Sequence, residues 1–182
     1  CSRHKCMNLI QEMQGTCPGF RGFVQGDHKL LEQVVRLGID CDVMVDLGTR
    51  AEIAKVAELL RSPGFSLRAL GLHYSPPPNT GRSDDPSQWS DLLDPALAAS
   101  SIRSLTLDYF DKMPVKTLPR LDDFTAKDCL FSNDECASIV VQPGCRRLTL
   151  QCSQTEAECW LYGFDAAQGK CQVEVLDMTG VL

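Results

Sequence analysis

The sequence predicts an α/β fold with a βαβαβ parallel core, followed by a cysteine-rich antiparallel C-terminal extension. Short runs of alternating apolar residues begin near positions 42, 67 and 102, and segments with the helical spacing of apolar residues separate them. After about residue 121 the helical spacing fades, while strand-like runs continue to residue 176. Strands that alternate with helices in this way favour a parallel sheet with right-handed crossovers.

Length and composition indicate a single domain over residues 1–182. Apolar residues make up 43% of the chain and charged residues 23%, which is typical of a folded protein with one core. We expect a helical N-terminal part at 1–40, βα units at 41–126 and a cysteine-rich β part at 127–182. The net charge of −6 lacks the basic excess that nucleic-acid backbones require, so no nucleic-acid partner is expected. No apolar run of about 18 residues is present, so no membrane span is expected.

Two helices are predicted ahead of the first strand. The apolar side chains of residues 6–13 share one helical face, and that segment ends at Gly15. A second amphipathic segment lies between Asp27, which is suited to cap its start, and Gly38, which is suited to end it.

The predicted βα units then follow one another along the chain. They are a strand at 42–47, a helix at 50–61, a strand at 66–72, a helix from 87 or 89 to 99, and a strand at 102–107. Thr49 is suited to cap the first of these helices. Residues 75–88 contain four prolines and are expected to form an exposed loop.

The last third of the chain is expected to be antiparallel. Its predicted strands are 121–126, 137–141, 146–152, 159–164 and 171–176. A short link that contains Gly169 is expected to join the last two strands as a hairpin. Trp160, Tyr162 and Phe164 alternate along one of these strands, so their rings would share one face. That face is either part of the core or, if exposed, a patch that binds a partner.

The ten cysteines predict a disulfide framework. They are Cys1, Cys6, Cys17, Cys41, Cys129, Cys136, Cys145, Cys152, Cys159 and Cys171. An even number at this density favours an oxidising compartment and therefore a secreted protein. The alternative is a cytoplasmic protein whose reduced cysteines act as small buried apolar residues. The spacing lacks the paired cysteines of a closed zinc site, so no metal is predicted.

Three polar residues occupy the carboxyl ends of the three predicted parallel strands. Asp46 ends the first, and His73 and Asp108 directly follow the second and third. The carboxyl edge is where open α/β sheets place ligands, so these residues would form a carboxylate–histidine–carboxylate cluster for acid–base catalysis, flanked by Tyr74 and Tyr109. The alternative is that they cap turns or face water. Nucleophile, phosphate-loop and dinucleotide motifs are absent from the sequence, so no cofactor is predicted.

A repeated L-x-x-L-x-L spacing underlies these strands. It occurs in Leu67-Leu70-Leu72, Ile102-Leu105-Leu107, Leu121-Phe124-Ala126 and Cys145-Leu148-Leu150, with a looser form in Asp42-Val45-Leu47. This spacing resembles a degenerate, helix-containing leucine-rich repeat. The resemblance implies an alternative fold, a short irregular leucine-rich-repeat solenoid, whose curved sheet binds another macromolecule and carries no chemistry.

These observations lead to one functional hypothesis and two alternatives. The first is a secreted, disulfide-stabilised interaction protein that binds a protein partner at a cell surface or host interface. The second is a small hydrolase-like enzyme built on the carboxylate–histidine site. The third is an intracellular leucine-rich-repeat adaptor fragment with reduced cysteines.

Overall fold

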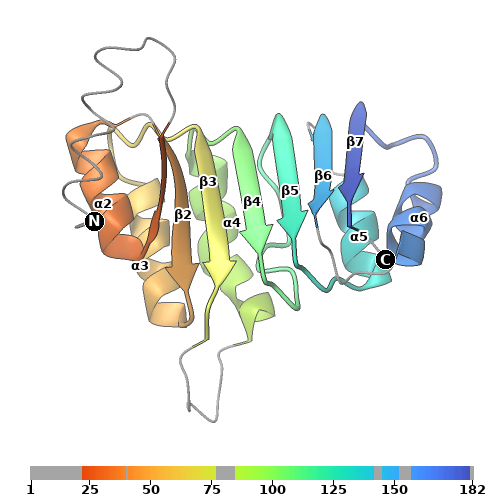
Figure 1. The fold of residues 1–182 in the computed structure, drawn as a ribbon, viewed down its shortest axis with the longest axis horizontal. Helices are drawn as coiled ribbons and strands as arrows, with labels where there is room; N and C mark the ends of the chain where they lie inside the picture. Colours follow the sequence, from red (N-terminus) through yellow and green to blue (C-terminus); the bar gives the residue numbers. More distant parts are fainter. Residues whose placement is uncertain (1–21, 40, 77–84, 142–144, 152–156, 181–182) are drawn as a thin grey trace.

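A single parallel sheet organises the molecule. The computed structural model describes residues 22–39, 41–76, 85–141, 145–151 and 157–180. Seven strands in these residues pair in parallel, and their order across the sheet is the order of the chain (Figure 1). Each strand therefore contacts the strand before it and the strand after it, as in proteins built from stacked repeats.

Helices connect most of the strands. The elements are β1 (Gly22–Gly26), α2 (His28–Leu37), β2 (Cys41–Leu47), α3 (Arg50–Leu60), β3 (Ala69–Tyr74), the short 3-10 helix η1 (Pro86–Trp89), α4 (Ser90–Ala99), β4 (Ser104–Asp108), β5 (Asp123–Lys127), α5 (Asn133–Val140), β6 (Arg147–Gln151), α6 (Ala157–Ala166) and β7 (Val175–Thr179). The helices α3, α4 and α5 lie behind the sheet in Figure 1, and no helix of the described chain crosses its front.

The core lies between the sheet and these helices. Strand residues that alternate toward the helices are apolar and buried, and equivalent positions stack in register across the sheet. One such row is Leu70, Leu105, Phe124 and Leu148, and the next is Leu72, Leu107, Ala126 and Leu150. The residues of these two rows are the second and third apolar positions of the L-x-x-L-x-L spacing. Burial of these side chains supplies most of the driving force for folding.

The predicted parallel core is confirmed. The strands β2, β3 and β4 pair in parallel, and the helices α3 and α4 lie between them at the predicted positions. Asp27 accepts hydrogen bonds from two backbone N–H groups at the start of α2, and Gly38 ends it with a φ of 62°. Thr49 and Glu52 form a capping box at the start of α3. The helix predicted at 6–13 lies outside the described residues.

The predicted antiparallel extension is not found, because β5, β6 and β7 continue the parallel sheet. Residues 137–141, predicted as a strand, fall largely in α5, and residues 159–164 lie within α6. The predicted hairpin is therefore wrong, since β7 follows α6 and pairs in parallel with β6. Short apolar runs fit a strand or a buried helix equally well, and here packing against the sheet selects the helix. The sequence analysis also missed β1.

The predicted disulfide framework is wrong for the six described cysteines, none of which forms a disulfide bond. Cys41, Cys129, Cys136 and Cys145 are buried, and Cys159 and Cys171 are half-buried. Burial raises the pKa of the Cys129 and Cys136 thiols to about 12 and that of Cys145 to about 11. These thiols are therefore neutral and pack as small apolar groups. The remaining predicted partners, Cys1, Cys6, Cys17 and Cys152, lie outside the described residues.

No described helix is long and apolar enough to cross a lipid bilayer.

Candidate functional site

The front of the sheet is a polar surface, which we call the open face. It consists of the strand side chains that point away from the helices, and parallel register arranges them in three rows. The carboxyl row is Asp46, His73, Asp108, Lys127, Gln151 and Thr179. The middle row is Gln25, Met44, Gly71, Thr106, Thr125, Thr149 and Asp177. The amino row is Phe23, Asp42, Ala69, Ser104, Asp123, Arg147 and Val175.

The three residues predicted to form an acid–base cluster occupy neighbouring positions in the carboxyl row. Asp46 pairs in register with His73, and His73 with Asp108. The Nδ1 atom of His73 lies 3.3 Å from Oδ2 of Asp108. Asp46 instead accepts a hydrogen bond of 2.9 Å from Nε2 of Gln25 on β1. The structure therefore joins His73 to Asp108 and holds Asp46 toward the first strand.

Asp108 is a buried carboxylate, with 5% of its surface exposed. Its Oδ2 atom contacts a side chain from each neighbouring strand. One is His73 on β3, and the other is Lys127 on β5, whose Nζ atom lies 3.2 Å away. Its Oδ1 atom is buried and has no hydrogen-bond partner within the described chain. A buried acceptor without a donor is costly, so it is a natural point for a donor from another molecule.

Tyr109 extends this cluster beyond the end of β4. Its φ of 68° is uncommon for a residue with a bulky side chain. The backbone N–H of Tyr109 donates to the carbonyl of Lys127 at 3.0 Å, which holds this conformation in place. The ring is 56% exposed and lies edge-on to His73, with 5.7 Å between ring centroids. Backbone strain of this kind is concentrated at functional sites.

The second predicted flanking residue has a different position. Tyr74 packs against Trp89 and Phe110, with ring centroids 5.8 Å and 5.6 Å away, and so belongs to the core rather than to the cluster. The sequence analysis missed Lys127. The signal for it was present, because Lys127 follows Leu121 by the same six positions that separate His73 from Leu67 and Asp108 from Ile102.

The predicted aromatic face at 160–164 is also wrong. These residues lie on α6, where successive residues turn by about 100°, so Trp160 and Tyr162 point in different directions. Trp160 is buried against Phe131, with 6.4 Å between ring centroids, and Phe164 is half-buried. Tyr162 is exposed, and these three rings do not form one binding patch.

Within the described ranges, no group of three or more histidine, cysteine, aspartate or glutamate side chains is arranged to hold a metal ion. No family model matches the sequence, and no curated protein or solved structure matches it either. The function of the open face must therefore follow from its own chemistry.

Proposed function

We propose that this chain is a protein-binding module, built as a short leucine-rich-repeat-like solenoid, whose open face receives a basic segment of a partner protein. The charges of the open face support a basic partner. They are the five aspartates Asp42, Asp46, Asp108, Asp123 and Asp177 against the cations Lys127 and Arg147. Complementary charge speeds association and excludes partners of like charge.

The stacked repeats support the solenoid part of the proposal. The four copies of the L-x-x-L-x-L spacing that begin at Leu67, Ile102, Leu121 and Cys145 place their last two apolar residues in the same two rows of the core. The looser copy at Asp42 is shifted by two residues, since Val45 pairs with Leu72. Among the residues that the structure describes, no helix covers the other face of the sheet (Figure 1), and repeat proteins use this kind of extended surface for binding.

The unpartnered Oδ1 of Asp108 is the observation that carries the proposal. It lies in the row that also presents His73 and Lys127, beside the exposed ring of Tyr109. A lysine or arginine from a partner would supply the missing donor by displacing a partly exposed neighbour such as Lys127, because Oδ1 itself is shielded from solvent. A charge-assisted hydrogen bond to a buried carboxylate is among the stronger polar contacts. Tyr109 adds the exposed aromatic surface that is typical of interface hot spots.

The test measures the binding of a lysine-rich octapeptide by calorimetry, at low and at moderate salt concentration. We expect Asp46→Asn with Asp177→Asn to weaken binding by about tenfold, because each removes a charge from the open face. The matched control is Glu32→Gln with Glu58→Gln, which removes the same charge from exposed positions on α2 and α3. Equal weakening by the two pairs would contradict the proposal, because net charge alone would then explain it.

Secretion is a separate prediction that the proposal does not use. Only disulfide bonds would indicate an oxidising compartment, and the described cysteines form none. Binding through the open face requires only the sheet and its polar rows.

A hydrolytic function is the second candidate, and the contact between His73 and Asp108 favours it. A carboxylate that orients a histidine is half of a general-base arrangement. Within the described chain, however, the His73 ring makes no hydrogen bond with a hydroxyl or thiol nucleophile. Hydrolysis of an activated ester that disappears in His73→Gln and persists in Glu58→Gln would support this candidate.

A further inference from the structure

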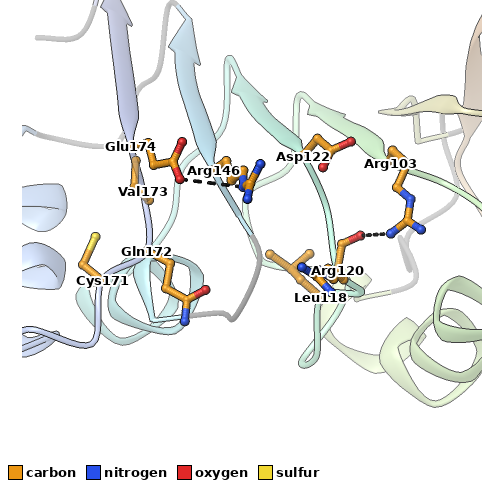
Figure 2. Close-up of a pocket in the computed structure, with 9 residues that line it drawn as sticks. All are labelled: Arg103, Leu118, Arg120, Asp122, Arg146, Cys171, Gln172, Val173 and Glu174. Atoms are coloured by element: carbon orange, nitrogen blue, oxygen red, sulfur yellow. Dashed lines mark hydrogen bonds and ion pairs between the residues drawn. The ribbon is translucent and has the colours of Figure 1, made fainter.

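A second polar site lies at the opposite edge of the sheet from the carboxyl row. A cavity of about 880 Å³ opens there, near the amino ends of β4 to β7. Its walls are Arg103, Leu118, Arg120, Asp122, Arg146, Cys171, Gln172, Val173 and Glu174 (Figure 2). We call it the arginine cavity. None of these residues belongs to the cluster around Asp108.

The fold brings the three arginines together from separate parts of the chain. Arg103 and Arg146 each precede a strand, and Asp122 precedes the strand between them. Because the strands are in register, these three positions follow one another in steps of about 5 Å. Arg120 comes from the connection between β4 and β5, and Leu118 beside it is buried.

Two of these guanidinium groups have no carboxylate partner among the described residues. Arg103 donates from Nη1 to the carbonyl oxygen of Arg120 at 3.3 Å, and neither residue forms an ion pair in the described chain. Arg146 is only loosely paired, with Nε 3.7 Å from Oε1 of Glu174. The neighbouring Arg147, outside the cavity, is closer to its carboxylate, at 3.5 Å from Asp123. The cavity therefore holds donors in excess of acceptors.

We propose that the arginine cavity binds a phosphate monoester. Its walls carry three guanidinium groups against the carboxylates of Asp122 and Glu174, which leaves a positive excess. Guanidinium forks bind phosphate oxygens in pairs, and a tetrahedral dianion accepts from several forks at once, whereas a carboxylate has two oxygens in one plane. The volume exceeds that of a phosphoryl group, so the cavity also accommodates part of the molecule that carries it.

The experiment compares three probes on the wild-type chain. They are an acetylated and amidated glycine–phosphoserine–glycine tripeptide, the same tripeptide without phosphate, and glucose 6-phosphate. We expect both phosphorylated probes to bind and the unphosphorylated tripeptide not to bind, as measured by shifts of the arginine Nε–H resonances. Tighter binding of the tripeptide identifies a phosphorylated protein as the source, and tighter binding of the sugar identifies a small metabolite.

Matched variants locate the binding. Arg103→Gln with Arg120→Gln is expected to weaken binding by about tenfold or more, because charge-assisted hydrogen bonds to the ligand are lost. Arg36→Gln with Arg61→Gln removes the same charge from exposed arginines at the ends of α2 and α3, outside the cavity, and is expected to change little. Asp122→Asn removes a repelling carboxylate and is expected to tighten binding about threefold. All four altered arginines are exposed, so an unchanged melting temperature is expected for both pairs.

Cys171 gives an independent readout. This half-buried residue belongs to the cavity wall, so a bound phosphorylated probe is expected to slow the reaction of its thiol with neutral N-ethylmaleimide. The proposal is overturned if neither phosphorylated probe binds, if the unphosphorylated tripeptide binds equally well, or if the two arginine pairs weaken binding to the same extent.

Discussion

The units from β2 to β4 and those from β5 to β7 have the same parallel geometry, but they reach it with different sequences. In the first region the helix α3 has eleven residues and a continuous apolar stripe. In the second, α5 has eight residues and ends in a run of β-branched residues, Ile139 to Val141, which on their own favour a strand. The difference shows that the stacking of one unit on the next selects helix over strand in the second region.

The α5–α6 contact shows how that selection works. A Cβ atom at Gly163 on α6 would lie 3.0 Å from the backbone of Ala137 and of Cys136 on α5. The two helices therefore approach to near backbone contact, and α6 brings Trp160 into the core. Close packing of this kind compensates for the weak helix preference of the α5 sequence. The spacing of apolar residues along the chain does not reveal such packing.

The largest expected effect comes from core truncation in both regions. Leu72 on β3 and Leu150 on β6 occupy the same apolar row and are fully buried. We expect Leu72→Ala and Leu150→Ala each to reduce the free energy of unfolding by about 2–5 kcal/mol. Because the core is continuous across the sheet, both variants should lower one shared transition in urea. Separate transitions for the two regions in Leu150→Ala would contradict that expectation.

The second effect tests the α5–α6 approach. Gly163→Val is expected to destabilise the fold by about 1–3 kcal/mol, because its side chain meets the backbone of α5. Gly71→Ala on β3 is the matched control. A methyl group there would lie 2.5 Å from Sδ of Met44, but that atom is the end of a flexible side chain that can move aside. Thermal unfolding of the two variants measures the difference, and equal losses would show that the helices are not closely constrained.

These two regions also show what the sequence can and cannot predict. Asp27, Gly38 and Thr49 identified helix ends because each acts through its own backbone neighbours. The neighbouring positions of Asp46, His73 and Asp108 followed from strand order alone. Residues 159–164 were misread as a strand because their alternation fits both structures, and only packing distinguishes them.

The candidate site shows the same division. The row at the carboxyl edge was predictable from repeat spacing, and the same spacing marks Lys127. The lost solvation of Asp108 Oδ1 and the positive φ of Tyr109 depend on long-range packing, so no local pattern contains them. The arginine cavity was missed because it gathers Arg103, Arg120 and Arg146 from separate connections.

The third effect is a dependence of stability on pH that comes from a buried thiol in the second region. Burial raises the pKa of Cys129 to about 12, whereas an unfolded thiol ionises near ~8.5. The folded state therefore keeps this proton to higher pH, and the stabilisation from Cys129 is complete below about pH 8.5 and is lost as the pH rises toward about 12. Above pH 9 we expect a loss of up to ~1.4 kcal/mol per pH unit from this thiol.

Cys129→Ala is expected to reduce the total slope by this share, while Cys136 and Cys145, whose pKa values burial also raises, keep the rest. The variant also loses some stability at neutral pH because the Cys129 side chain is buried. Urea unfolding at pH 8, 9 and 10 measures it, with Thr125→Ser on the same strand as a variant that leaves the slope unchanged. An unaltered slope in Cys129→Ala would show that this thiol does not keep its proton in the folded state.

The smallest expected effect compares the capping boxes of α3 and α5. Thr49 and Ser132 each accept from the backbone N–H three residues on, and Glu52 and Glu135 each accept from the backbone N–H of the cap residue. We expect Thr49→Ala and Ser132→Ala each to cost about 1 kcal/mol in urea unfolding, with Thr49→Ser as the conservative control. If the short α5 were formed by packing alone, Ser132→Ala would cost nothing. An equal cost would instead mean that α5 starts on a local signal and needs the sheet only to hold its β-branched end.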